Sequence, residues 1–207
     1  MTRKRLMATA TLLAVLLSST ALSAQDLKLY AFSSGALTLG KGFLVNGAPM
    51  EPTIQVPVGF YVIKHPKGNV LFDTGNNDKI ITDPGYWGAA FTALKPVNTP
   101  DVAIDTQLKK IDLTPDDIAY VVVSHLHLDH GRNVGQFPNA TLVTQEDELK
   151  AAWWPDVGFS VYYIPGDFAD TKKMNIIRLN GDLDLFDDGS VRIMRAPGHT
   201  PGSQFLT

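Results

Sequence analysis

The sequence predicts a layered α/β (α+β) protein with one domain. Strand and helix signals alternate along the chain, which is typical of sheets covered by helices. The composition is that of a globular protein, with 44% hydrophobic and 19% charged residues. Residues 118–123 form an apolar run that is β-branched in its last three positions. Such a run is typical of a strand that is buried on both faces.

The first part of the chain contains three predicted strands, at residues 27–32, 60–65 and 69–73. Pro66 and Gly68 lie between the second and the third. Because Pro fixes φ and Gly accepts a positive φ, these two strands are expected to form a hairpin. Residues 76–98 then form a long loop, which we expect to be a lid over a site or a packing cover.

Helices and strands alternate after this loop. Thr99 and Pro100 predict the start of a helix that continues to residue 111. After the strand at 118–123, we expect helices at 133–137 and 145–153, strands at 140–144, 175–179, 183–186 and 191–196, and a hairpin turn at 187–190. Residues 202–206 resemble the beginning of another strand. We therefore expect the chain to be a fragment, cut short at its C-terminal end.

The first 23 residues are predicted to be a secretory signal peptide. Three basic residues at positions 3–5 precede an apolar run at 6–17 and small residues up to position 24, which is the order found in such peptides. The alternative, an uncleaved anchor, needs an apolar run of roughly 20 residues. We expect residues 24–207 to be one domain, exported to the periplasm or secreted, and without a membrane association after cleavage.

Charge and cysteine content exclude other classes. The net charge is −3, and removal of the three basic residues at positions 3–5 makes it −3 − 3 = −6. An acidic chain is a poor partner for nucleic acid, whose phosphates require a basic surface. The chain contains no cysteine, so cysteine nucleophiles and cysteine metal ligands are excluded within it.

A metal site is predicted directly after the strand at 118–123. Three histidines and an aspartate lie within six residues: His125, His127, Asp129 and His130. In an extended segment, the side chains at positions 125, 127 and 129 point the same way, and a turn is expected to bring His130 back to the same cavity. Imidazole nitrogen and carboxylate oxygen suit Zn²⁺ and similar ions. The alternative is an accidental run of surface histidines.

A second motif supplies a distant histidine. His199 lies in the sequence Pro-Gly-His-Thr-Pro-Gly at residues 197–202, and the prolines and glycines on both sides predict a rigid loop. Together, His125, His127 and His199 form a predicted three-histidine site with a position left for water. Asp129 and His130 are then half of a second metal site.

Two further residues are secondary candidates. Asp73 ends a predicted strand in the sequence Asp-Thr-Gly. It either caps a turn or is an acid that orients a ligand histidine from behind. His65 lies in a predicted turn, and we interpret it as an ordinary structural residue.

The order of the three motifs, at residues 73–75, 125–130 and 197–202, resembles that of the metallo-β-lactamase superfamily. The resemblance covers nearly all of the mature chain. Segments 65–75 and 184–191 look like the N-acyl-homoserine lactonase group, although Arg132 stands where Gly is common. The fold that this implies is a four-layer αββα sandwich of two similar halves, of which the second is incomplete here.

The resemblance also implies a dinuclear site. His125, His127 and His199 match the ligands of the first metal. Asp129 and His130 match part of the second set, and Asp73 matches an early acid near the site. A bridging aspartate and a last histidine would lie beyond residue 207. We therefore expect two Zn²⁺ ions in a complete protein, with other divalent metals also compatible.

The implied activity is hydrolysis of N-acyl-homoserine lactones, which quenches quorum sensing. The expected partner is a small lactone, attacked at its carbonyl by water that the metals activate. Asp129 would also handle a proton, and Tyr86, Trp87 and Phe91 would hold the acyl chain. The alternatives are an exported β-lactamase, another ester, phosphotriester or aryl-sulfate hydrolase of the superfamily, and an inactive metal-binding fragment.

Overall fold

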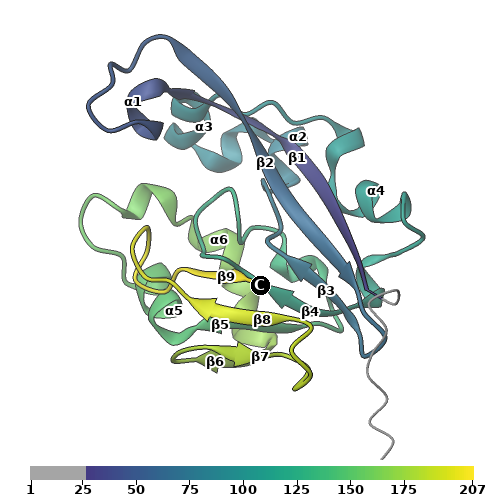
Figure 1. Ribbon diagram of the computed structural model, residues 1–207. Helices are drawn as coiled ribbons and strands as arrows, with labels where there is room; N and C mark the ends of the chain where they lie inside the picture. Colours follow the sequence, from purple (N-terminus) through teal and green to yellow (C-terminus); the bar gives the residue numbers. More distant parts are fainter. Residues whose placement is uncertain (1–26) are drawn as a thin grey trace, which may run out of the picture.

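The computed structural model describes residues 27–207, so the predicted signal peptide at residues 1–23 lies outside the described residues. The described chain forms two β-sheets with short helices around them (Figure 1). This is the layered α/β class that the sequence predicts. Among residues 27–207, no helix has the length and apolar character that a membrane crossing requires.

The larger sheet has six strands in the order β1-β2-β3-β4-β5-β6. The β1–β2 and β2–β3 pairs are antiparallel, and the β3–β4, β4–β5 and β5–β6 pairs are parallel. The bounds are β1 Lys28–Gly40, β2 Thr53–Lys64, β3 Asn69–Phe72, β4 Ile118–Val122, β5 Thr141–Gln145 and β6 Asn175–Leu179. A smaller antiparallel sheet contains β7 Leu183–Asp184, β8 Arg192–Arg195 and β9 Gln204–Leu206.

The first two strands are much longer than predicted. The expected strand at residues 60–65 is the last half of β2, and the expected strand at 27–32 is the first half of β1. A register shift between Ser33 and Ala36 interrupts β1. Gly35 occupies it with φ of 110°, and a Cβ there would lie 2.2 Å from the Val97 carbonyl oxygen. This irregularity breaks the alternation of side chains from which a strand is recognised.

Short helices fill the connections between the strands. The α-helices are α1 Lys41–Leu44, α2 Lys79–Thr82, α3 Ala89–Leu94, α4 Ile104–Lys109, α5 Glu146–Trp153 and α6 Pro165–Phe168. The 3₁₀-helices are η2 Pro84–Trp87, η3 Pro100–Val102, η4 Pro115–Asp117, η5 Val134–Gln136, η6 Ser160–Tyr162 and η7 Ala169–Lys173. The predicted loop at 76–98 therefore contains two α-helices and a 3₁₀ turn. The predicted helix at 99–111 is split because the backbone of Ala103 is extended, with ψ of 142°.

Alternate residues of the central strands face two different cores. Leu71 and Val121 pack on the helical side with Phe168 of α6 and with residues of α4 and α5. Val70 and Val122 pack on the other side against the small sheet. This alternation places one layer of helices, the large sheet and the small sheet on top of one another. Residues 27–207 put no helix on the outer face of the small sheet (Figure 1), which corresponds to three of the four expected layers.

Candidate metal centre

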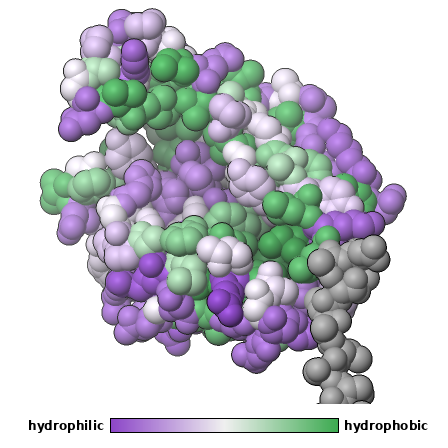
Figure 2. Space-filling view, in the orientation of Figure 1, coloured by the Kyte–Doolittle hydropathy of each residue, from purple (hydrophilic) through white to green (hydrophobic). Residues whose placement is uncertain are grey.

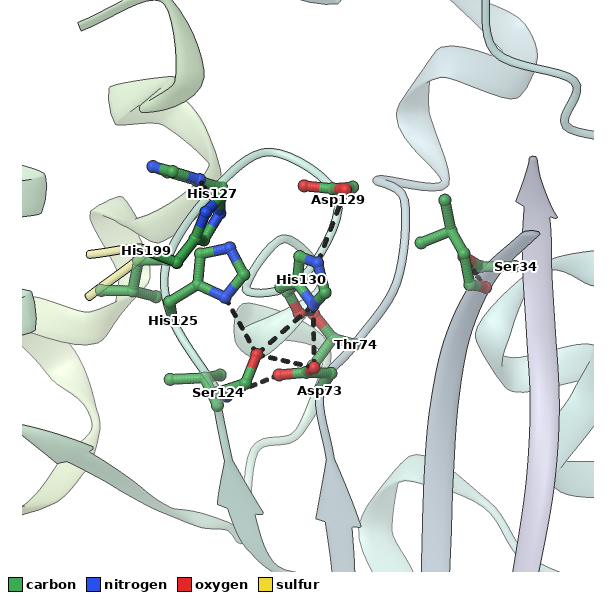
Figure 3. A network of polar contacts seen from close by, with 12 residues as sticks. Ser34, Asp73, Thr74, Ser124, His125, His127, Asp129, His130 and His199 are labelled. Carbon is green, nitrogen blue, oxygen red and sulfur yellow. Dashed lines mark hydrogen bonds and ion pairs between the residues drawn. The ribbon is translucent and has the colours of Figure 1, made fainter. Parts of the chain in front are cut away.

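Three loops meet at one edge of the sandwich and carry the predicted ligands. One loop follows β3, the second follows β4, and the third connects β8 to β9. Because β3 and β4 are parallel neighbours, their carboxyl ends lie at the same edge, where ligands of α/β sheets usually bind. Figure 3 shows the side chains of these loops pointing toward one another.

The histidine rings form two groups that share His125. Ligand atoms of His125, His127 and His199 lie within 4.8 Å of one another, and so do those of His125, Asp129 and His130. Within the first group, His127 Nδ1 is 3.1 Å from His199 Nε2. The structure thus brings together all five residues that were predicted as ligands. It also adds His125 to the second group, for which the sequence suggested only two members.

The path of the chain through this motif differs from the predicted one. We expected residues 125–129 to be extended, with Asp129 beside His127. Instead, a turn forms at residues 128–130, closed by a hydrogen bond of 3.0 Å from the His130 amide to the His127 carbonyl. Because the turn begins before Asp129, that carboxylate lies with His130 in the second group, to which the sequence analysis assigned it.

Asp73 lies directly behind this cluster. Its Oδ2 is 2.8 Å from His130 Nδ1, and its carboxylate also accepts hydrogen bonds from the backbone amide and the hydroxyl of Ser124, at 2.6 and 2.8 Å. Its backbone has φ of 59°, a left-handed conformation that Asp and Asn tolerate better than most residues. Of the two alternatives for Asp73, the structure favours the acid that orients a ligand histidine.

Thr74 and Asn133 hold the end of this turn in place, and the sequence analysis did not single them out. The Thr74 amide and hydroxyl both donate to the His130 carbonyl, at 2.6 and 2.9 Å. Asn133 in turn donates to the Thr74 and Asn76 carbonyls at 2.9 Å each. The Asp-Thr-Gly sequence therefore docks on the histidine motif through its backbone. A polar run after a strand was the only signal in the sequence, and it is common in ordinary turns.

Burial keeps the imidazoles of His125 and His127 neutral. His125 and His127 are each 6% exposed. Burial, followed by the positive charge of neighbouring histidines, lowers the pKa of His127 to about 3 and that of His125 further still. Neutral imidazole is the form that binds metals. The donor set fits a metal ion, since Nε2 of both histidines is buried without a hydrogen-bond partner in residues 27–207.

His130 and Asp129 form an ion pair in the metal-free protein. Burial acts to lower the pKa of His130, but Asp129 and Asp73 outweigh it and raise this pKa to about 10. Burial likewise acts to raise the pKa of Asp129, and His130 holds that pKa well below its usual range. His130 Nε2 is 3.5 Å from Asp129 Oδ2. The opposite charges of these two side chains therefore balance each other. A bound cation would replace His130 as the electrostatic partner of Asp129.

His65 lies outside the cluster, as interpreted from the sequence. Its ring stacks on Phe186 with centroids 3.9 Å apart, and its Nε2 is 3.0 Å from the Ser190 hydroxyl. It therefore joins the large sheet to the small one.

One cavity is lined by candidate ligands, and a second one is lined by a residue that lies between two of them in the sequence. One of about 280 Å³ is lined by His127 and His199 together with Ala151 of α5, Phe159 and Tyr163. The other, of about 190 Å³, is almost entirely apolar and is lined by Leu128, which lies between two ligands, and by residues of α1, α3 and η6. The expected acyl-chain residues Tyr86, Trp87 and Phe91 line neither cavity. Trp87 is 3% exposed and packs in a core with Leu128, because η2 turns its ring inward.

Fold and site together define a metal-dependent hydrolase scaffold, and comparison with known proteins gives its family. A model described as the metallo-beta-lactamase superfamily matches residues 55–207. The chain belongs to this superfamily.

The similar proteins include N-acyl homoserine lactonases. The N-acyl homoserine lactonase AttM of Azorhizobium caulinodans is 38% identical over 191 residues, which are 86% of this chain and 70% of that protein. The AttM lactonase of Agrobacterium fabrum has the same identity and coverage. The N-acyl homoserine lactonase AiiA of Bacillus thuringiensis subsp. kurstaki is 27% identical over 181 residues, with 86% and 69% coverage.

Solved structures show the same fold. An N-acyl homoserine lactone hydrolase with the product N-hexanoyl-L-homoserine at its catalytic metal centre matches with a TM-score of 0.74 and 27% identity, over 86% of this chain and 68% of that one. A Bacillus thuringiensis AiiA mutant with N-decanoyl-L-homoserine at its active site matches with a TM-score of 0.75, 27% identity and the same coverage.

Proposed function

We propose that this protein is a metal-dependent hydrolase that opens the lactone ring of N-acyl-homoserine lactones and so quenches quorum sensing. The observation that carries the proposal is the pair of ligand groups that share His125 at the edge of the sandwich. The similarity to lactonases of 38% identity supports the choice of substrate. Zn²⁺ is the proposed metal, because its preferred ligands in proteins include imidazole nitrogen and carboxylate oxygen.

The residues of the chain have separate roles in this reaction. His125, His127 and His199 would hold one ion, and Asp129 and His130 would contribute to holding a second. Bound divalent metals polarise a carbonyl and lower the pKa of water. Asp73 keeps His130 in one orientation through its hydrogen bond of 2.8 Å.

Hydrolysis adds water across the ring ester. The bond between the carbonyl carbon and the ring oxygen breaks, a hydroxyl is added to the carbon, and a proton goes to the leaving ring oxygen. Asp129 is the carboxylate proposed to accept a proton from the attacking water and pass it to this oxygen, since its side chain is 26% exposed at the edge of the ligand cluster. The ring-opened product is an N-acyl homoserine.

The apolar cavity of about 190 Å³ is the proposed place of the acyl chain. Its lining includes Leu128, which lies between the ligands His127 and Asp129 in the sequence, and Phe43, which is 60% exposed. Figure 2 shows apolar surface gathered over α1 and α3, at the top of the view. An acyl chain that enters there is stabilised by about 25 cal/mol for each Å² of apolar surface that it removes from water.

The proposed location is the periplasm or the medium, with residues 1–23 removed as a signal peptide. The support is the sequence order of basic, apolar and small residues. N-terminal sequencing of the protein purified from its own host tests this, and an intact Met1 would contradict it.

A substrate panel tests the activity. Protein loaded with Zn²⁺ is incubated with N-hexanoyl-L-homoserine lactone, a chromogenic β-lactam and a phosphotriester, and the products are measured by mass spectrometry. We expect ring-opened acyl homoserine as the main product. Substitution His127→Ala should lower the rate by more than about 100-fold, since the loss of an outer-shell partner alone costs about 10- to 100-fold. His65→Gln, at a histidine outside the cluster, is the matched control. Faster turnover of the β-lactam or the phosphotriester would overturn the proposed substrate.

A further inference from the structure

Glu148 is a fully buried acid that touches both metal-binding loops without being a ligand. It lies in the first turn of α5 and is 0% exposed. One carboxylate oxygen accepts a hydrogen bond from the Leu126 amide at 2.7 Å and another from the Tyr163 hydroxyl at 3.3 Å. The other oxygen accepts from the Thr200 hydroxyl at 2.5 Å.

Each of these three donors is a neighbour of a ligand histidine. Leu126 lies between His125 and His127, and Thr200 directly follows His199. The Tyr163 ring packs edge-on against the His127 ring, with centroids 4.8 Å apart. A single carboxylate therefore connects two loops whose contact residues are separated by 74 positions, since 200 − 126 = 74.

The loop of His199 lies directly on this part of α5. A Cβ at Gly202 would be 2.2 Å from the Glu148 backbone nitrogen, so only glycine allows the close approach. The Thr200 hydroxyl is also 2.8 Å from that of Ser203. Because the loop touches α5 through both its backbone and a side chain, the position of His199 depends on the first turn of this helix.

Hydrogen bonds from neighbouring groups offset the free-energy cost of burying Glu148. Within residues 27–207, Glu148 forms no ion pair. Burying a polar group without hydrogen-bond partners costs free energy. Three hydrogen bonds offset part of this cost.

We propose that Glu148 is a positioning residue of the metal centre, which fixes the His125–His127 loop and the His199 loop relative to each other through Leu126 and Thr200. The inference rests on the proposed metal site and is independent of the lactone substrate. A ligand set assembled from two loops that are distant in the sequence keeps its affinity for the metal only if both loops are held in fixed relative positions.

The test compares side chains that differ in one group. Thr200→Val removes the hydroxyl and keeps the shape, Thr200→Ser restores the hydroxyl, and Glu148→Gln removes the charge and one acceptor. Glu146→Gln is the matched control, because Glu146 lies in the same turn of α5 but pairs with Lys150 at the surface. Zn²⁺ affinity is measured by competition with a chromogenic chelator. Site geometry is followed by the visible spectrum of the Co²⁺-substituted protein, and folding is followed by circular dichroism.

Glu148→Gln and Thr200→Val should each weaken Zn²⁺ binding by about 10- to 100-fold and change the Co²⁺ spectrum. Thr200→Ser should recover most of the affinity, and Glu146→Gln should match the wild type. Wild-type affinity and an unchanged spectrum in folded Thr200→Val would overturn the inference. A wild type that binds Zn²⁺ but leaves lactones intact would overturn only the proposed substrate, because the affinity comparison is made without a lactone.

Discussion

Asp73 and His130, 57 residues apart in the chain, are joined by a hydrogen bond of 2.8 Å between Oδ2 and Nδ1. The bond fixes the ring of His130 and directs its Nε2 toward Asp129 (Figure 3). A histidine that donates through one ring nitrogen to a carboxylate presents the other to a metal as a stronger base.

Asp73→Asn should therefore weaken metal binding while preserving the fold. Asn tolerates the left-handed backbone that Asp73 adopts, but it lacks the charge that polarises His130. We expect Zn²⁺ affinity to fall by about 10- to 100-fold in chelator competition. Asp116→Asn, at an exposed acid, is the control. Equal affinities for the two variants would contradict the role given to Asp73.

The two glycines around His199 should respond differently to alanine. A Cβ at Gly202 would meet the Glu148 backbone nitrogen at 2.2 Å, whereas a Cβ at Gly198 would have no atom within 4 Å. Gly202→Ala should lower the free energy of unfolding in urea by about 1–3 kcal/mol or more, as overpacking does. Gly198→Ala should change it by less than about 0.5 kcal/mol. A similar loss for both would show that the loop does not lie against α5.

His65 should make stability depend on pH. Burial lowers the pKa of His65, although Asp188 raises it and Lys67 adds to the lowering. Because this pKa is lower in the folded than in the unfolded protein, the unfolded state binds the extra proton. The stability contributed by neutral His65 is complete above about pH 6.5, the unfolded pKa, and is lost as the pH falls below it.

The measurement is urea unfolding between pH 5 and 8 for the wild type and for His65→Gln. The other histidines are common to both proteins, so their titration cancels in the difference. We expect the stability advantage of the wild type to shrink as the pH falls below about 6.5. A constant difference across this range would mean that His65 has the same pKa in both states.

Removing one member of the buried pair Arg132–Asp167 should lower the unfolding free energy strongly, whereas replacing both members by apolar residues should lower it less. The two charged groups are 2.5 Å apart, and both side chains are 0% exposed. Burial lowers the pKa of Arg132 to about 10 despite Asp167, and burial also raises the pKa of Asp167 despite Arg132. Desolvation therefore outweighs the attraction in both cases.

Arg132→Met leaves a buried, unpaired acid and should cost about 3–5 kcal/mol of unfolding free energy. The double variant Arg132→Met, Asp167→Leu should recover a large part of this loss. Denaturation midpoints in urea give the comparison. A double variant less stable than Arg132→Met would show that the ion pair itself stabilises the fold.

Metal binding should stabilise the folded protein. At a free Zn²⁺ concentration of 100 times Kd, binding contributes about 2.7 kcal/mol, which raises Tm by about 5–10 °C in a chain of this size. A chelator should reverse the shift, and His127→Ala should remove most of it. Mg²⁺, which prefers oxygen ligands in octahedral geometry, should have little effect. Equal shifts with Zn²⁺ and Mg²⁺ would contradict a histidine site.

Several elements could be predicted because their signal is local. Strand β6 has the expected bounds, Asn175–Leu179, and α5 begins within one residue of its predicted start. In contrast, the part of β1 beyond residue 32 was missed, because a bulge and a small-residue stretch hide its alternation. Helix α3 was also missed. Its capping residue Gly88 has φ of 52°, and no side-chain cap indicates its start.

The sequence by itself determined the ligand types and their positions, because His125, His127, Asp129 and His130 lie within six residues and their chemistry needs no distant partner to be recognised. Only the tertiary structure decided that both ligand groups share His125, since the turn at residues 128–130 brings Asp129 and His130 within 4.8 Å of it. It also decided the roles of Asp73 and Glu148. A carboxylate becomes a positioning group only through burial and through donors that lie far away in the chain, and neither property is written in its local sequence.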